Sequence, residues 1–320
     1  MLTLAALFSF CLNNPAQLAK EETKGPQKIK AGVYITQVFG LKSNAEFFQA
    51  DFWFWLNYPG KPVDYFSKME FFNSLEARQI TRDTEEIQGV NWDAAKYSNK
   101  IAKSWDVAHF PFDKHTLELQ IESTRPISEI ILEPDTKDFG INPTIAMDGW
   151  KVLGKRLRVD RAKYTSRFGA PNPENGEEFH RAILSIEIRR DALSLFFKLH
   201  AGVYVTFAIT MLSYFMSPAG DDIFSARMGL IVAMLFASLV NLQIVDNTIG
   251  QTNSLSLPDK IHIFTMINLL VAVAATLYSR RFCERGKKVF AKEFDRICLG
   301  LQSLAYLGLN IILILLAAYS

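Results

Sequence analysis

The sequence predicts an α+β protein in which an exported, immunoglobulin-like β-sandwich is followed by four transmembrane helices. Three observations lead to this fold class. Residues 1–195 carry 51 of the 68 charged side chains, so the last 125 residues are poor in charge. Four stretches within those last residues are apolar and long enough to cross about 30 Å of hydrocarbon. The charged part instead alternates polar and apolar residues with the period of two that is typical of strands.

The overall composition would by itself suggest an ordinary soluble protein. The chain has 320 residues, is 49% hydrophobic and 21% charged, and carries a formal net charge of +2. These values exclude a disordered chain, a collagen-like repeat and a polybasic nucleic-acid-binding protein. The sequence also lacks a phosphate-binding loop, a Gly-x-Ser-x-Gly nucleophile elbow and a metal-ligand motif. We therefore expect no enzyme activity, no cofactor, no metal site and no nucleic-acid partner.

Residues 1–19 are predicted to be a signal peptide. The stretch MLTLAALFSFC resembles an apolar signal core, and KEETK after it looks like mature chain, although a basic n-region and a clear cleavage site are missing. Residues 20–195 are then predicted to form the extracellular β-sandwich. None of the three cysteines (Cys11, Cys283 and Cys298) lies in this domain, so it has no disulfide framework.

The predicted membrane domain covers residues 196–320. Its helices are expected at 196–216, 228–245, 261–279 and 297–318, because backbone polar groups in lipid must be satisfied within their own segment. The segment 280–296 carries seven basic residues, whereas the loop 246–260 carries only Lys260. Since cytoplasmic loops are rich in Lys and Arg, segment 280–296 is predicted to be a short cytoplasmic loop. A multi-pass protein of the cell (inner) membrane follows, with the β-domain and the C-terminus outside.

The strand pattern is clearest in HTLELQIES (115–123) and HRAILSIEIRR (180–190), where every second residue is apolar. Two further segments, 31–40 and 47–59, look like an N-terminal strand pair. Turn signals rich in proline, glycine and asparagine separate these segments at short intervals. Many short strands with regular turns indicate a sandwich.

One stretch carries a resemblance to a known family. WDVAHFPFDKHTL (105–117) resembles the signature loop of the pentameric ligand-gated ion channels, the Cys-loop receptors. Two cysteines flank this loop in animal members, and their positions fall here at Lys103 and Leu117. The chain is therefore similar to the prokaryotic branch, which lacks the bridge. Other matching features follow in the family's order: Gly149-Trp150, Arg189-Arg190, FSAR at 224–227 and Leu257-Pro258.

The resemblance implies a homopentameric channel. In this family an agonist bound between adjacent extracellular domains opens a pore lined by the second membrane helix. One departure from the family is Gly202, which stands where many relatives have a proline that kinks the first membrane helix. Glycine can also loosen a helix, so the fold expectation is unchanged.

The second membrane helix has one face suited to line a pore. Small, bulky apolar and amide residues recur along it at spacings of three and four. They are Gly229, Ala233, Phe236, Val240, Gln243 with Ile244, and Asn247. Five copies around an axis would leave a narrow path with an apolar ring at Phe236, which could stop ions by dewetting. On pattern alone, ordinary helix-packing surface is the favoured interpretation of the stripe, and the family resemblance is what favours a pore.

Four residues at the start of this helix bear on ion selectivity: Asp221, Asp222, Ala226 and Arg227. The Ala226-Arg227 pair is similar to the Pro-Ala-Arg of anion-selective relatives, whereas rings of aspartate favour cations. Because bacterial relatives are mostly cation channels, we expect passive conduction of cations. The alternatives are an anion-selective channel of the same family and a non-conducting membrane receptor whose Phe236 ring stays closed.

The resemblance further implies a coupling region where the β-domain meets the membrane. A partly buried carboxylate there needs a cation, because an unpaired buried charge is costly. We therefore expect Asp113 to pair with Arg190, either for gating or as a purely structural ion pair. The other expected members of this region are Lys42, Phe110, Pro111, Phe112 and Pro258.

Family members bind agonists in a box of aromatic side chains, and aromatic faces combined with acids suit an amine. The hairpin 164–180 corresponds to the loop that caps this box. The candidate residues are Tyr164, Phe168, Glu177 and Phe179 from the hairpin, Phe72 and Phe139 from other loops, and Trp53 or Trp55 from the opposite face. Packing within the core is an equal alternative for each aromatic. Since His109, His115 and Glu177 could also sense protons, we expect a small extracellular ligand or protons as the activating partner.

Overall fold

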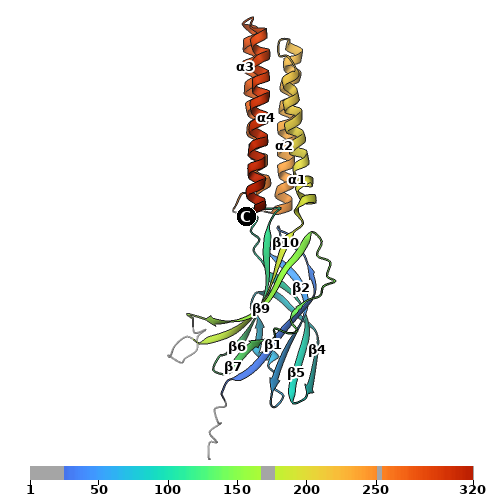
Figure 1. The fold of residues 1–320 in the computed structure, drawn as a ribbon, viewed down its shortest axis with the longest axis vertical. Coiled ribbons are helices and arrows are strands. Elements are labelled where there is room, and N and C mark those ends of the chain that lie inside the picture. The colour runs from blue at the N-terminus through green and yellow to red at the C-terminus, as the bar shows by residue number, and fades with distance from the viewer. Residues whose placement is uncertain (1–24, 167–176, 251–253, 320) are drawn as a thin grey trace, which may run out of the picture.

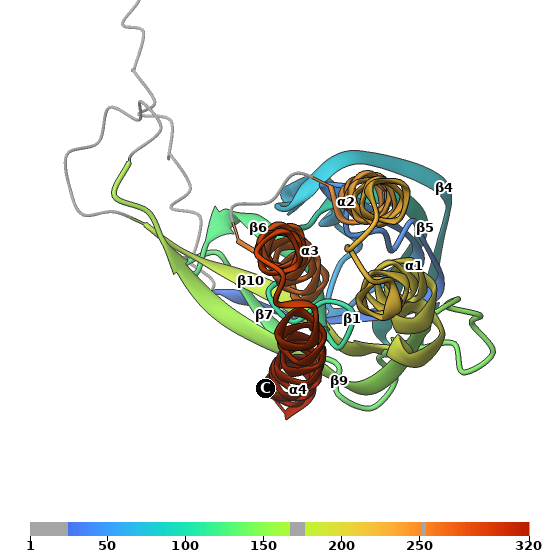
Figure 2. The same ribbon diagram turned by 90° about the horizontal axis from the view of Figure 1, so that it is seen from above.

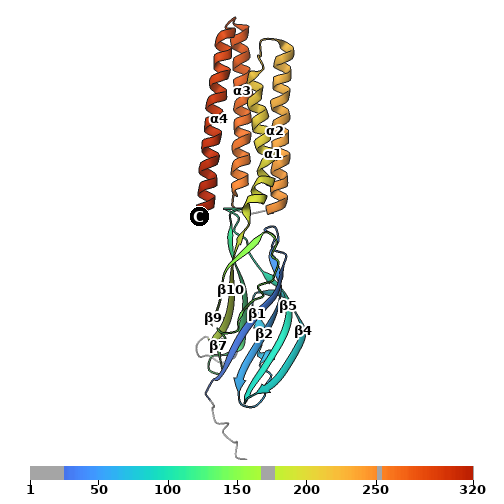
Figure 3. The ribbon, with the colours of Figure 1, turned by 45° about the vertical axis from the view of Figure 1, so that its right-hand side comes forward.

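The computed structural model describes residues 25–166, 177–250 and 254–319, which form a two-sheet β-region followed by four long helices (Figure 1). The predicted signal peptide and Phe168 lie outside the described residues. The helices stand side by side on one end of the β-region, and their axes follow the long axis of the molecule (Figures 1 and 3). This confirms the predicted order of a β-rich part followed by apolar helices.

The β-region consists of two sheets. The first has the strand order β4-β5-β2-β1-β7, with β8 also paired to β1, and the second has the order β3-β6-β10-β9. Strands β7 and β8 pair parallel to β1, whereas β1 and β2 are antiparallel. Within the described residues the strands are β1 (Gln27–Phe39), β2 (Phe47–Pro59), β3 (Met69–Phe71), β4 (Ser74–Ile87), β5 (Val90–Ala102), β6 (Lys114–Pro126), β7 (Ile130–Pro134), β8 (Gly140–Ile141), β9 (Trp150–Lys163) and β10 (Glu178–Arg190).

The core between the sheets follows directly from the alternation of side chains. On β2, Phe52, Phe54 and Leu56 are fully buried, while the residues between them are only half-buried on the outer face of the sheet. The apolar rows predicted on β6 and β10 are buried too, because a period of two places them on the same face. Replacing one of the buried phenylalanines by alanine would cost about 3–5 kcal/mol of stability.

The four helices are α1 (Ala192–Leu212), α2 (Asp221–Ile249), α3 (Leu257–Glu284) and α4 (Lys288–Tyr319). Within the described residues these four are long and apolar enough to span a membrane, so the chain has the spans of a multi-pass membrane protein. Helix α1 begins earlier than its predicted span and also ends earlier, at Leu212 rather than at residue 216. Helices α2, α3 and α4 extend beyond their predicted spans at both ends, because hydropathy marks only the part suited to hydrocarbon. For the same reason the segment 280–296, expected to be a loop, is mostly helical and leaves only residues 285–287 as the turn.

The start of α3 is fixed by a capping box. The Ser256 hydroxyl accepts the backbone N–H of Asp259, and the Asp259 carboxylate accepts the Ser256 N–H at 2.8 Å. Pro258 is tolerated in this first turn because the amides there have no partner within the helix. The three residues together set where α3 begins.

Helix α1 continues through Gly202 and packs beside α2 (Figure 2). The Asn241 side chain of α2 lies where a side chain at position 202 would begin, and it is fixed there by a hydrogen bond from its amide nitrogen to the Ala237 carbonyl. The glycine therefore allows the close approach of two helices. The sequence showed only that a glycine stands where many relatives have a proline, and this alone could not predict the close approach of α1 and α2.

Candidate functional site

A cluster of charged groups lies at the junction between the β-region and the helices. Arg190, the last residue of β10, donates two hydrogen bonds to Asp113, from Nε at 2.7 Å and from Nη2 at 2.9 Å. Nη2 also donates to the Ser43 hydroxyl at 2.7 Å. The Asp113 and Arg190 side chains are only 2% and 9% exposed, so this ion pair is buried. The predicted pair is thus present as a contact, and Ser43 is a further member that no sequence pattern indicated.

Aromatic rings surround this ion pair. The Arg190 guanidinium lies 4.0 Å from the Trp150 ring centroid and 4.7 Å from that of Phe110. His115 Nε2 lies 2.7 Å from the second carboxylate oxygen of Asp113. Burial by itself would raise the pKa of Asp113, but the hydrogen bonds from His115 and Arg190 outweigh it and hold that pKa below its usual range. Asp113 therefore stays ionised inside the protein.

The turn between β1 and β2 connects this cluster to the end of α2. Next to Ser43, the Asn44 side chain donates a hydrogen bond to the backbone carbonyl of Asn247 at 3.2 Å. Asn44 also packs against Gly250, which ends α2 with φ of +85°; a Cβ at this position would lie 3.0 Å from Asn44. A glycine is needed here both for the left-handed conformation and for the contact. A continuous chain of contacts therefore runs from Arg190 to α2.

The other residues expected in this region have different surroundings. Phe110 and Pro111 are buried, and their peptide bond is cis. Phe112 contacts Phe196 of α1 with ring centroids 5.8 Å apart. The carbonyl of buried Pro258 lies 2.8 Å from His262 Nδ1 within α3. The Lys42 side chain is exposed, whereas the side chains of the next two residues, Ser43 and Asn44, make the hydrogen bonds described above.

The predicted pore-lining face of α2 is exposed along its whole length in the single chain. Every one of its residues is exposed, including Gly229, Ala233, Gln243, Ile244 and Asn247. Phe236 and Val240 are 63% and 59% exposed, which is high for large apolar side chains. The opposite face packs against the rest of the chain through Arg227, Ile231, Ser238, Val245 and Ile249. Helix α2 therefore has one packed side and one side without a partner in the described chain.

Charges at the start of α2 are separated into buried and exposed groups. Arg227 is fully buried and donates two hydrogen bonds, of 2.8 and 3.1 Å, to the carboxylate of Asp295 on α4. Asp221 is exposed and pairs with Arg280 of α3. Ala226 and Asp222 are exposed, and within the described residues no cation lies within ion-pair distance of Asp222. Asp222 is thus the charge at this helix end with no partner in the described chain.

Three of the predicted aromatic ligand residues gather on the second sheet around an arginine. The Arg181 guanidinium lies 3.6 Å from the Phe72 ring centroid and donates to the Tyr164 hydroxyl at 2.8 Å. Its Nε donates at 2.7 Å to Glu122, which also accepts a 2.5 Å hydrogen bond from Tyr164. Phe179 packs edge-on against Tyr164, with centroids 5.8 Å apart. The chain's own cation therefore occupies the aromatic group where an amine was expected.

The remaining ligand candidates lie elsewhere. The Trp55 indole lies against Gly32 of β1 and donates its N–H to buried Asp135 at 3.2 Å. Trp53 is half-buried on the same outer face of the first sheet. Phe139 lies beneath the Lys155 ammonium, 5.3 Å from it. Glu177 is exposed at the edge of the described hairpin.

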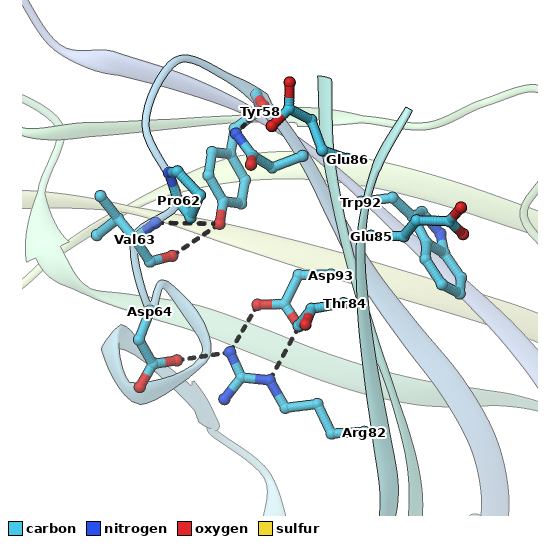
Figure 4. A pocket seen from close by; sticks show the side chains of 11 residues that line it. Tyr58, Pro62, Val63, Asp64, Arg82, Thr84, Glu85, Glu86, Trp92 and Asp93 are labelled. Atoms are coloured by element: carbon cyan, nitrogen blue, oxygen red, sulfur yellow. Dashed lines mark hydrogen bonds and ion pairs between the residues drawn. The ribbon is translucent and has the colours of Figure 1, made fainter. Parts of the chain in front are cut away.

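A cavity of about 310 Å³ is lined by residues of β2, β4 and β5 and of the loop after β2 (Figure 4). Its residues lie around the turn between β4 and β5, at the end of the β-region far from the helices. Figure 3 shows the position of these strands. Arg82 lies in the wall of the cavity and binds Asp93 through two hydrogen bonds of 2.9 and 2.6 Å and Asp64 through one of 2.7 Å (Figure 4). The arginine charge is therefore already matched. The sequence signal for this cavity was a polar Asp93 at an inward-facing position of β5, which the strand patterns considered above did not include.

No protein-family model matches the chain, and a search of curated proteins finds no match. The proposed function therefore rests on the residues and contacts described above.

Proposed function

We propose that the chain is the subunit of a homopentameric ligand-gated ion channel, similar to the prokaryotic branch of the Cys-loop receptor family. The observation that carries the proposal is the exposed face of α2. Beside Phe236 and Val240 this face exposes the amide of Gln243, which lipid cannot hydrogen-bond, so the face needs a partner other than lipid. Five copies around an axis would turn this face toward a common pore, with an apolar constriction at Phe236 and amides at the outer end.

The proposed channel conducts cations. Arg227 supports this choice because its charge is buried and bound to Asp295, so it adds no positive ring to the pore mouth. Asp222 remains exposed at the same end of α2, and five copies of it would form an acidic ring that attracts cations. An anion-selective channel would instead need an exposed positive charge at this end of the α2 face, and the residues there are Ala226 and Asp222.

In this proposal the Asp113–Arg190 pair couples ligand binding to the pore. Its support is the contact chain through Ser43 and Asn44 to the end of α2. The activating ligand is a small extracellular molecule or a proton, and the β-region faces the outside. Exchanging the two charges (Asp113→Arg with Arg190→Asp) should give subunits that assemble into a channel, but ligand should no longer open that channel. Full gating by Arg190→Ala would reduce the pair to a structural role.

Current recordings test the channel proposal. The purified full-length protein in planar bilayers should pass cation currents when exposed to a panel of amines, amino acids, divalent ions and pH steps. Phe236→Ala should raise the resting current by removing the apolar constriction. The matched control is Leu304→Ala, another large exposed apolar residue, which lies on α4. We expect this control to behave like the wild type.

The outcome also separates the alternatives. Current from Phe236→Ala but never from the wild type under any ligand would indicate a non-conducting receptor. A reversal potential that moves to the chloride potential under a NaCl gradient would indicate an anion channel. Native mass spectrometry that finds a stoichiometry other than five would overturn the pentamer.

A further inference from the structure

Two buried histidines lie next to each other between α1 and α3. His200 of α1 and His262 of α3 are both 0% exposed, and their ring centroids lie 6.3 Å apart. Each is in the first half of its helix, so both lie toward the end of the bundle that joins the β-region. Imidazole is the commonest metal ligand in proteins, so a buried pair of this kind is a candidate metal site.

The hydrogen bonds of the two rings fix which nitrogen carries the proton. His200 Nδ1 lies 2.8 Å from the Phe196 carbonyl oxygen, and His262 Nδ1 lies 2.8 Å from the Pro258 carbonyl oxygen. A carbonyl oxygen can only accept a hydrogen bond, so Nδ1 is the donor in both rings. In a neutral ring with its proton on Nδ1, the Nε2 atom carries a free lone pair.

Neither of these lone pairs is used within the described chain. Both Nε2 atoms are buried, and no described residue hydrogen-bonds to them. The surroundings are apolar, since His200 stacks on Phe196 with centroids 4.2 Å apart and Val203, Leu257 and Ile261 are buried in the same cluster. A buried acceptor that lacks a donor is costly. Two such acceptors side by side therefore indicate a bound group.

The geometry suits one ion held by both rings. Nδ1 of each ring is turned toward its own helix backbone, so Nε2, across the ring, points away from that helix. Helices α1 and α3 pack against each other, and the two lone pairs therefore point into the space between them. With metal–nitrogen bonds of about 2 Å, two imidazole rings on one ion have centroids roughly 5–6 Å apart, close to the observed 6.3 Å.

The ligand number and the charge favour a monovalent ion. No group of three or more His, Cys, Asp and Glu side chains that could hold a metal occurs among the described residues, so the two imidazoles would be the only such ligands. A structural zinc ion needs four ligands, and a divalent charge in this apolar cluster would be uncompensated. Monovalent copper is stable with two ligands in a line, and imidazole suits copper. The upper end of the centroid range belongs to this linear arrangement.

We propose that His200 and His262 bind one monovalent copper ion through their Nε2 atoms and thereby join α1 to α3. The step is coordination only, because two nitrogen–copper bonds form and no electron or proton is transferred. The sequence led us to expect no metal site, since the two histidines lie far apart and form no motif. The site adjoins the coupling region, because Phe196, which stacks on His200, also contacts Phe112. The proposal needs the contact between α1 and α3 but not the channel activity.

Metal binding by the full-length protein in detergent tests the proposal without any current measurement. Thiols compete for soft ions, so the chain used carries Cys11→Ala, Cys283→Ala and Cys298→Ala. Silver(I), which has the same charge and the same linear preference as copper(I) but is not oxidised by air, is titrated in a chloride-free buffer. Copper(I) is then bound under argon for X-ray absorption. We expect one ion per subunit, a higher melting temperature, and two nitrogen neighbours at about 2 Å from the copper.

Removing either histidine should abolish tight binding. His200→Gln and His262→Gln should each lower the silver affinity roughly 100-fold or more, because even a residue that only orients a metal ligand contributes about 10–100-fold. His109→Gln is the matched control, since it removes an exposed histidine elsewhere, and it should leave the affinity unchanged. His262→Met replaces one imidazole by a soft thioether and should keep silver binding, which separates loss of a ligand from loss of folding.

Three outcomes would overturn the proposal. Equal silver affinity before and after His200→Gln would place the ion elsewhere in the protein. Tighter binding of zinc(II) than of silver(I) at the two histidines would show that further ligands complete a divalent site. No binding of either ion would mean that the two nitrogens share a water molecule only.

Discussion

Arg190 and Asp113, which are 77 residues apart in the sequence, form a bidentate ion pair with N–O distances of 2.7 and 2.9 Å at the junction between the β-region and the helices. Both side chains are buried, so each is needed to compensate the charge of the other. The pair joins the end of β10 to the loop 105–113 at the point where the chain enters α1.

Removing one partner of this pair should be more harmful than removing both charges. Arg190→Ala leaves the Asp113 carboxylate buried, and we expect a loss of about 3–5 kcal/mol of unfolding free energy. The double variant Asp113→Asn with Arg190→Gln should recover most of the loss. Thermal unfolding of Asp113→Asn, Arg190→Gln and the double variant in detergent measures the coupling as a double-mutant cycle. If the effects of the two substitutions on stability are strictly additive, the two charges are not coupled and the prediction is wrong.

Asp222 is expected to control ion selectivity, and Arg227 is not. Asp222→Asn should lower the preference for cations and shift the reversal potential under a NaCl gradient toward the chloride potential. Arg227→Gln with Asp295→Asn removes a charge pair that is buried away from the exposed face of α2. If this double variant shifts the reversal potential as strongly as Asp222→Asn does, selectivity is not controlled by Asp222 alone and the prediction is wrong.

Gly202 should tolerate no side chain while Asn241 is present. Gly202→Ala forces a methyl group into the amide of Asn241, and overpacking of this kind costs about 1–3 kcal/mol. Asn241→Ser in the same chain should relieve the crowding. Gly308→Ala on α4 is the control, because a Cβ there meets nothing within 4 Å. The melting temperature should fall only for Gly202→Ala, and an equal fall in the Gly308 variant would refute the explanation.

Acid should weaken the contact between the two sheets at His180. Its Nδ1 accepts the backbone N–H of Leu132 at 3.0 Å, which links β10 to β7. Burial lowers the pKa of His180 below its ordinary value of 6.5, and the Arg161 charge adds to this. Because the folded-state pKa is below the unfolded one, the stabilisation is complete above pH 6.5 and is lost as the pH falls toward the lowered value.

Hydrogen exchange measures this effect at a single site. Protection of the Leu132 amide should fall between pH 7 and pH 5 in the wild type. His180→Gln still offers an acceptor but does not titrate, so its protection should change little after correction for intrinsic exchange. The same pH dependence in both proteins would show that another group is responsible.

Arg181 should be replaceable by a free cation. Arg181→Ala leaves Phe72, Tyr164 and buried Glu122 around an empty position, with the carboxylate uncompensated. Millimolar guanidinium should therefore raise the melting temperature of this variant, although the same concentration leaves the wild type unchanged. Rescue by acetate instead would show that the site prefers anions.

Much of the fold could be predicted because it depends on local patterns. The alternation in β6 and β10 and the four apolar segments identify their elements without any long-range contact. Helix ends were predicted less well, since α3 and α4 continue into water by backbone hydrogen bonding that hydropathy does not report. The Asp113–Arg190 contact was predicted because a buried carboxylate needs a cation and the family order offered one.

Other contacts between polar residues far apart in the sequence could not be predicted. Nothing in the sequence near Ser43 or Asn44 indicates that they connect Arg190 to the end of α2. The burial of Arg227 could not be predicted either, because one rotation of α2 about its axis would expose the side chain and another would bury it. The partner Asp295, which lies 68 residues away, determines the choice.

The sequence by itself determined the order of the domains, the number of spans and the stripe of residues along α2, because periodicity and hydropathy are properties of neighbouring residues. Only the tertiary structure decided which face of α2 is packed, which acid neutralises Arg227, and that Arg181 lies within the aromatic group. Those outcomes depend on the free energy of burying charges. A buried charge is acceptable only where the fold brings its counter-charge within hydrogen-bond distance.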